Sequence, residues 1–258
     1  MPELSVDHIQ AIIPFLAIGF FAQLVDGALG MAFGVITNTL LVSVLGLPPA
    51  RASASVHMVE SFTTAASAIS HTLHRNVNWR LFARLVIPGM IGGITGAYLL
   101  ASIDAKAARP YVMTYLALIG LYLLWRAWQM SHHHEHKPAR VVEPLGLIGG
   151  FLDAAGGGGW GPIVTSNLLV QGVEPRQTIG TVNTAEFFLT TVISATFIAT
   201  IGLEAFTIAA VGLIIGGLFA APFGAVLAKR IPARRLMFMV GTVLTLTSSY
   251  SLYKALVG

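Results

Sequence analysis

The chain has 258 residues, of which 55% are hydrophobic and only 10% are charged, and its mean hydropathy is +0.77. Because soluble domains carry about 25% charged residues, this composition excludes an ordinary water-soluble protein. The formal net charge of +4 does not indicate a nucleic-acid partner, because the basic residues lie between apolar runs, where they orient a membrane protein. Cysteine is absent, which excludes disulfides and thiolate ligands.

Uncharged apolar runs decide the fold class. A run of about 18 such residues or more predicts a transmembrane helix, whereas a membrane barrel would have short alternating segments. No Asp, Glu, Lys or Arg occurs at 27–50, 85–103, 154–173, 205–228 and 236–253. We therefore expect an all-α, multi-pass protein of the cytoplasmic (inner) membrane. The first residues lack the basic region of a signal peptide, so we expect the first apolar segment to be retained.

Each half of the chain is predicted to hold five helical segments. In the first half they run over 8–25, 31–46, 51–72, 80–101 and 109–129. In the second half they run over 144–154, 160–172, 176–200, 205–229 and 234–256. The polar stretch "MSHHHEHKPARVVE" separates the halves. We therefore predict a first membrane repeat at 1–129, a His-rich cytoplasmic linker at 130–143 and a second membrane repeat at 144–258.

The histidines of the linker allow two interpretations, a metal trap and a solvated loop. We favour the solvated loop, because no second cluster of ligands would close a metal site. Accordingly, we expect neither a metal nor a cofactor.

The two halves resemble each other in sequence. "LVDGALGMAFG" (24–34) aligns with "FLDAAGGGGWG" (151–161), and "PARASASVHMVESFTT" (49–64) aligns with "PRQTIGTVNTAEFFLT" (175–190). A repeat of about 127 residues in a membrane protein is typical of two pseudo-symmetric bundles.

Loop charges predict that the repeats are inverted. The densest basic clusters lie in non-equivalent loops, between the third and fourth segments of the first half and between the fourth and fifth of the second. Their members are Arg75, Arg80, Arg84, Lys229, Arg230, Arg234 and Arg235. An odd number of crossings per half puts both clusters on one side, which is cytoplasmic by the positive-inside rule. Both termini then face outward, whether the first two segments of each half span the membrane or form re-entrant hairpins.

Glycines interrupt the apolar segments at equivalent places, "DGALGMAFG" (26–34) and "DAAGGGGWGP" (153–162). Each glycine costs a helix interior ~1 kcal/mol relative to alanine, and broken helices inside a membrane must be buried or line a cavity. The helix starts that follow carry partial positive charge and free N–H groups, so two of them meeting at mid-membrane would form an anion site. Close helix packing through small residues is the alternative.

Anion-binding groups are predicted from the second break and from the third segment of each half. Backbone N–H groups would come from Gly157, Gly158, Gly159 and Gly161, with Trp160 as a wall of the cavity. The expected side-chain donors are Ser53, Ser55, Thr181 and Asn183.

Ionisable residues within the apolar segments are candidates for proton coupling. Glu60 and Glu186 lie two to three turns inside their helices, where a carboxyl group is costly and marks a functional site by default. His57, three residues before Glu60, is its expected partner and the third candidate for proton coupling. Asp26 and Asp153 flank the breaks, where each either caps the following helix or takes part in transport.

The paired motifs at 27–57 and 156–183, glycine-rich and followed by a proline and small residues, resemble those of the sulfite exporter TauE/SafE (TSUP) family. The resemblance extends over nearly the whole chain. It implies a carrier that moves a small sulfur-containing anion, such as sulfite or an organosulfonate, across the cytoplasmic membrane, in some members as an exporter that uses the ion gradient. From the residues we expect two inverted bundles that rock around a central site in the lipid bilayer, which gives alternating access, with protons as the coupling ion.

Two other functions stay open at this point. An anion channel would share the polar lining without coupling to protons. An intramembrane enzyme would need a nucleophile with a positioned base, and only Ser53 and His57, one helical turn apart, fit that description. We therefore expect a transporter and not an enzyme.

Overall fold

The computed structural model describes residues 6–29, 31–129, 139–203, 207–230 and 233–257. The described residues form helices and contain no strand, which confirms the predicted all-α class. The helices of the first half are α1 (Val6–Leu29), α2 (Phe33–Ser43), α3 (Pro49–Leu73), α4 (Trp79–Ser102) and α5 (Ala105–Gln129). Those of the second half are α6 (Glu143–Gly156), the π-helical turn η1 (Gly161–Thr165), α7 (Ser166–Val170), α8 (Pro175–Ile201), α9 (Thr207–Arg230) and α10 (Ala233–Val257).

The apolar helices have the lengths that a membrane protein requires. Within the described residues, α4, α5, most of α8 and most of α10 are long and apolar enough to cross a bilayer. Two of the uncharged runs, 27–50 and 154–173, are not single helices, because each contains a break. The histidines at 132–134 and 136 lie outside the described residues, so the interpretation of the linker stays a prediction.

Local sequence signals explain where the helices around the breaks begin. Pro49 and Pro175 occupy the first turn of α3 and α8, where the fixed φ of proline suits a helix and its missing N–H costs nothing. The side chain of Glu174 accepts hydrogen bonds from the first N–H groups of α8, and Asn78 does the same for α4.

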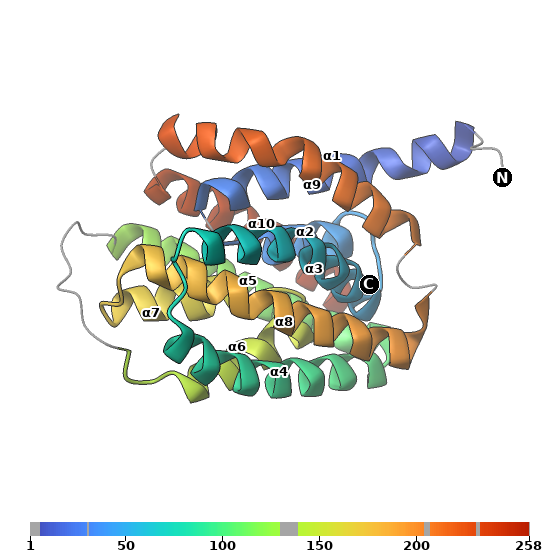
Figure 1. The fold of residues 1–258 in the computed structure, drawn as a ribbon. Helices are drawn as coiled ribbons and strands as arrows, with labels where there is room; N and C mark the ends of the chain where they lie inside the picture. Colours follow the sequence, from blue (N-terminus) through green and yellow to red (C-terminus); the bar gives the residue numbers. More distant parts are fainter. Residues whose placement is uncertain (1–5, 30, 130–138, 204–206, 231–232, 258) are drawn as a thin grey trace.

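Packing interlocks the two halves. The most extensive helix interfaces pair α1 with α9, α4 with α6, α5 with α10, and α3 with α8, so each joins a helix of the first half to one of the second. Figure 1 shows α1 with α9 along one edge of the molecule and α4 with α6 along the opposite edge. A side chain at Gly92 of α4 would overlap the backbone of α6, and one at Gly216 of α9 that of α1. Small residues thus permit close packing.

The pairing pattern also bears on the repeat. Because α1 corresponds to α6 and α4 to α9, the first helix of each half packs on the fourth helix of the other. A two-fold relation between the halves requires this exchange. The inverted orientation of the halves relative to the membrane stays a prediction.

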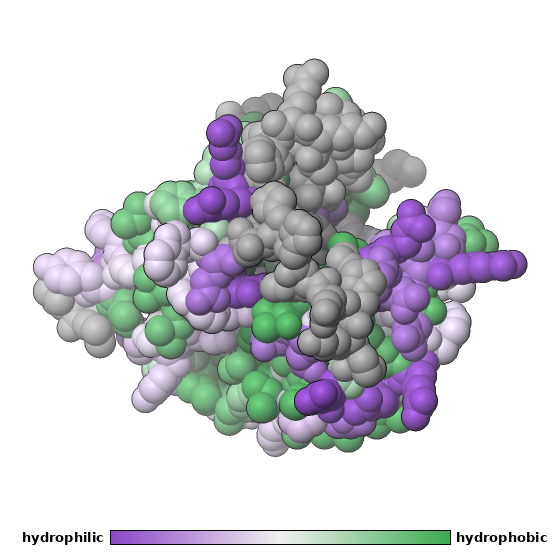
Figure 2. All heavy atoms as spheres, turned by 90° about the vertical axis from the view of Figure 1, so that its left-hand side faces the viewer, coloured by the Kyte–Doolittle hydropathy of each residue, from purple (hydrophilic) through white to green (hydrophobic). Residues whose placement is uncertain are grey.

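The basic loops gather at one end of the molecule. In Figure 1, the turn from α3 to α4, the end of α5 and the start of α10 lie at the left-hand end, whereas α1 begins and α10 ends toward the right. Looking onto the left-hand end, Figure 2 shows clusters of hydrophilic side chains on this face. The arrangement places the predicted cytoplasmic loops together, opposite the start of α1 and the end of α10.

Candidate functional site

The two helix breaks meet inside the molecule. A Cβ atom at Gly158, in the second break, would overlap the backbone of Gly34 and Val35 at the start of α2. Both breaks use unusual backbone conformations, with a φ of 105° at Ala32 and of 147° at Gly159. Only glycine adopts such angles without strain. The expectation that two interrupted helices begin beside each other is therefore met.

A cavity of about 270 Å³ lies where the breaks meet. This volume is slightly below the about 300–1,000 Å³ of typical ligand pockets and suits a small ligand. The starts of both broken helices line the cavity through residues 31–35 and 159–162. Its other lining residues are Gln23, Asp26, Glu60, Thr63, Thr64, Ser67, His71, Asp153, Ile179, Asn183 and Glu186.

An aspartate caps each broken helix. The Oδ1 atom of Asp153 accepts the backbone N–H of Trp160 at 2.8 Å, and the Oδ1 atom of Asp26 accepts that of Phe33 at 3.1 Å. In both halves the cap precedes its N–H donor by seven residues. The capping role expected as one alternative for these aspartates is thus present, and part of the positive charge of each helix start is already balanced.

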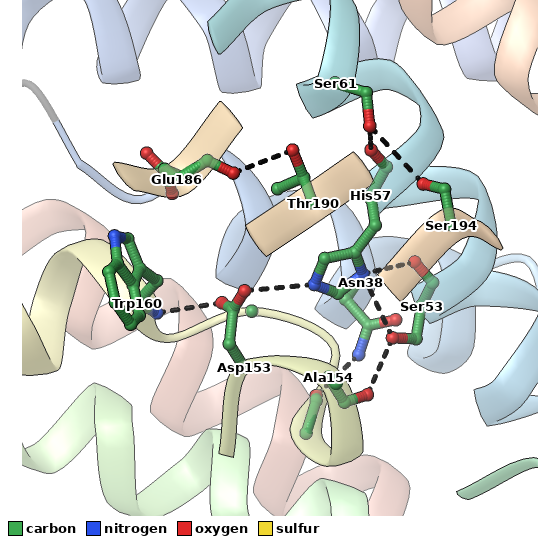
Figure 3. A network of polar contacts seen from close by, with 12 residues as sticks. Asn38, Ser53, His57, Ser61, Asp153, Ala154, Trp160, Glu186, Thr190 and Ser194 are labelled. Carbon is green, nitrogen blue, oxygen red and sulfur yellow. Dashed lines mark hydrogen bonds and ion pairs between the residues drawn. The ribbon is translucent and has the colours of Figure 1, made fainter. Parts of the chain in front are cut away.

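The second carboxylate oxygen of Asp153 contacts His57. Asp153 Oδ2 lies 3.1 Å from His57 Nε2, and the two side chains are 3% and 0% exposed. Figure 3 shows Asp153 between the Trp160 backbone and the His57 ring. The expected pairing of His57 with Glu60 is therefore corrected, because the His57 ring reaches across from α3 to α6 and not along its own helix.

The other nitrogen of His57 is held by its own helix. Nδ1 lies 2.7 Å from the Ser53 carbonyl oxygen and 3.3 Å from Ser53 Oγ. That hydroxyl donates its hydrogen to the Ala154 carbonyl at 2.8 Å, so toward His57 it can only accept. Both neighbours of Nδ1 are therefore acceptors, and Nδ1 must carry a hydrogen.

Carboxyl groups dominate the charge of the cavity. Asp26, Asp153, Glu60 and Glu186 line it, whereas no Lys or Arg occurs among its described lining residues. Glu60 is only 6% exposed, and its Oε2 atom has no hydrogen-bond partner. These four positions were all singled out by the sequence, because ionisable residues in apolar helices are rare.

Three of the expected side-chain donors are not in the cavity. The Ser53 hydroxyl is used by Ala154, and the Ser55 hydroxyl donates to the Arg51 carbonyl one turn back. Thr181 Oγ1 accepts the backbone N–H of Asn78 at 2.9 Å, ahead of α4. Of this set, only Asn183 lines the cavity, and the role of the other three in anion binding stays a prediction.

The glycine-rich stretch divides between two roles. Gly159, Trp160 and Gly161 line the cavity as expected. Gly157 instead packs against the Asn38 side chain, and Gly158 against the start of α2. These two glycines are thus packing positions, and their role in anion binding stays a prediction.

Four contacts beside the cavity join the second helix break to the first half of the chain, and we call this group the closed end. Besides Ser53–Ala154 and His57–Asp153, the side-chain amide of Asn38 donates to the Gly156 carbonyl at 2.9 Å. The Tyr115 hydroxyl donates to the Gly158 carbonyl at 2.9 Å. All four join α6 or the turn after it to a helix of the first half.

Several lining residues were missed by the sequence analysis. Thr64, Ser67 and His71 follow Glu60 at helical spacing, so periodicity along α3 could have identified them. Asn38 and Tyr115 gave no signal, because their partners lie 118 and 43 residues away.

Helices interrupted inside an apolar bundle, with their starts facing a polar cavity, are the arrangement of secondary transporters. The fold and the site therefore define a membrane transporter. The chain belongs to the sulfite exporter TauE/SafE family, whose family model matches residues 15–251, as the paired motifs had indicated.

The search of curated proteins gives the same class. The chain is 40% identical over 250 residues to the probable membrane transporter protein YtnM of Bacillus subtilis (strain 168). The alignment covers 94% of this chain and 83% of that relative. No solved structure matches the chain.

Proposed function

We propose that the protein is a secondary transporter that exports a small sulfur-containing anion, such as sulfite or an organosulfonate, across the cytoplasmic membrane. It works by alternating access and is coupled to the proton gradient. The observation that carries the proposal is the cavity where the two helix breaks meet, lined by four carboxyl groups. The family description supports the substrate class and the direction.

The cavity offers neutral donors for a small anion. The backbone N–H groups of Gly159 and Gly161 lie at the start of a broken helix, and the amides of Gln23 and Asn183 and the Ser67 hydroxyl line the same space. Helix starts and amide donors hold oxyanions without a positively charged side chain.

Because four carboxyl groups line the cavity, the binding of an anion depends on their protonation. Two like unit charges 4 Å apart repel by about 4 kcal/mol at an effective dielectric constant of 20, so an anion and ionised carboxylates exclude each other. Glu60 and Glu186 are the groups without a capping role among the four carboxyls. Protonation of these two groups admits the anion, so the binding of protons and of the anion are linked, and this linkage couples anion movement to the proton gradient.

The cavity extends along α3 as a polar path. Along α3 it is lined by Glu60, Thr64, Ser67 and His71, which spans about 16 Å at 1.5 Å per residue. The path leads to the end of α3, where the basic loops gather (Figure 1). With the loops assigned to the cytoplasm, we infer that the cavity faces inward.

The enzyme alternative is not supported by the geometry. Ser53, His57 and Asp153 form a chain of contacts like that of a serine hydrolase. However, the Ser53 hydroxyl hydrogen is donated to Ala154, and His57 Nδ1 carries a hydrogen, so it cannot take a proton from Ser53. Ser53 and His57 are also fully buried.

The proposed substrate class is tested by ligand-induced stabilisation and by flux. The panel contains sulfite, thiosulfate, sulfate and sulfonates that include taurine. We expect sulfite, thiosulfate or a sulfonate to raise the melting temperature, because a ligand that binds the native state stabilises it. The same anion should move into proteoliposomes with saturable kinetics. Ohmic conductance without saturation would instead establish a channel.

Changing Glu186 to glutamine removes a titratable group and keeps the shape of the side chain. We expect Glu186→Gln to abolish anion flux driven by a pH gradient while the protein still folds, and Glu60→Gln to act in the same direction. Glu174→Gln is the matched control, because Glu174 lies outside the cavity and caps α8. Flux equal to that of the wild type in Glu186→Gln would remove Glu186 from the mechanism.

A further inference from the structure

We propose that the His57–Asp153 pair is a proton-dependent latch: one proton, shared by the two side chains, holds the closed end of the cavity shut, and the loss of this proton lets it open. The inference rests on the proposed transport function and adds a second proton-binding group to Glu60 and Glu186. It concerns the wall of the cavity, not the anion-binding groups.

Hydrogen bonding requires the shared proton. His57 Nδ1 carries a hydrogen because the Ser53 carbonyl, at 2.7 Å, can only accept. If Asp153 were ionised and His57 neutral, a bare ring nitrogen would face a carboxylate oxygen at 3.1 Å. Two acceptors at that distance repel. The contact therefore holds one proton, either as imidazolium and carboxylate or as imidazole and carboxylic acid.

The His57–Asp153 pair joins the two halves of the molecule, so its shared proton can hold them together. His57 is on α3 of the first half and Asp153 is on α6 of the second, next to the Ser53–Ala154 bond. The remaining contacts of the closed end, from Asn38 and Tyr115, are hydrogen bonds between neutral groups. The contact between His57 and Asp153 is thus the one contact of the closed end that joins two ionisable side chains.

The proton has a route to water. Asp153 lines the cavity, whereas His57 lies behind it and is fully buried. The proton therefore enters and leaves through the Asp153 side, and its exchange depends on access to the cavity.

The charged groups around the pair are acidic. Glu60 on α3 and Glu186 on α8 interact electrostatically with Asp153, as does the Tyr115 phenol on α5. Asp26 on α1 lines the same cavity. In their ionised form the three carboxylates favour retention of the shared proton. Protonation of Glu60 or Glu186 weakens this effect, so the latch responds to the state of the cavity.

The latch exists in one half of the molecule. The position equivalent to His57 is Asn183, and the position equivalent to Ser53 is Ile179. Asp26, the counterpart of Asp153, thus has an amide in the place of the imidazole. An amide does not titrate, so each molecule holds one such shared proton and not two.

Flux under an imposed pH gradient tests the latch. We expect a pH gradient to accelerate sulfite movement by wild-type proteoliposomes by about 10-fold, within the usual range of coupling between two sites. His57→Asn should lose this acceleration but keep sulfite-for-sulfite exchange at equal pH. His74→Asn is the matched control, since His74 makes the same bond to a carbonyl four residues back but is exposed. Full acceleration in His57→Asn would overturn the proposal.

Nitrogen NMR of labelled histidine tests the latch without transport. The His57 signals are identified by their loss in His57→Asn or His57→Gln, whichever variant folds. We expect Nδ1 to carry a hydrogen and Nε2 to show a proton shared with Asp153. An Nδ1 without hydrogen would overturn the proposal. If the wild-type protein moves no anion, the transport proposal fails, and the NMR result still decides the latch.

Discussion

Replacing Asp153 by alanine is expected to reduce anion flux to the level of empty liposomes and to lower the free energy of unfolding by about 3–5 kcal/mol, the cost of removing one partner of a buried pair. The substitution leaves His57 Nε2 without its partner and the Trp160 N–H without its cap. Both losses fall at the break that forms the cavity. The measurements are sulfite flux in proteoliposomes and unfolding in detergent.

Two further variants separate stability from transport. Asp153→Asn keeps an oxygen for the Trp160 N–H but cannot share a proton with His57, so we expect it to fold better than the alanine variant and still not to couple to protons. Asp104→Ala is the matched control, because Asp104 also caps a helix start, that of α5, but on the surface. We expect it to cost about 1 kcal/mol and to leave flux unchanged. Wild-type flux in Asp153→Ala would contradict the proposed site.

Gly158→Ala is expected to disrupt the junction of the two helix breaks and to abolish transport. The backbone at Gly158 has a φ of 138°, which costs another residue about 1–3 kcal/mol. The new methyl group would also overlap the backbone of Gly34 and Val35, and overpacking costs about 1–3 kcal/mol more. We expect a much lower yield of folded protein and no sulfite flux from the folded fraction.

Gly46→Ala isolates the conformational part of this effect. Gly46 also has a positive φ, of 70°, but nothing lies within 4 Å of an added Cβ atom. We expect it to cost about 1 kcal/mol, as for a single left-handed residue, and to leave flux unchanged. Equal loss of stability in both glycine variants would show that the contact between the breaks contributes nothing.

The helices and their breaks could be predicted because their signals are local. Apolar runs, prolines and glycines placed each segment within a few residues of the observed helices. The four carboxyl positions could be predicted for an energetic reason, since an acidic residue is rarely placed in an apolar helix without a role.

The partners of the polar groups could not be predicted in this way. Helical periodicity identifies the face on which Ser53 or His57 lies, but their partners are on α6, about 100 residues away. Thr181 lies on a polar position of α8, and only the fold brings Asn78 to it. Long-range packing therefore decided which hydroxyls were free to face the cavity.

The exchange of helices between the halves has a consequence for biogenesis. While the ribosome is still making the second half, α1 has no α9 and α4 has no α6, so their glycine seams meet lipid instead of a neighbour. Until then the first helix break, which includes Asp26 and the strained Ala32, lies in the bilayer without the second break, which packs against it in the complete protein. Insertion of the helices and their final assembly are thus separate stages, and the second stage cannot be completed before α9 has left the translocon.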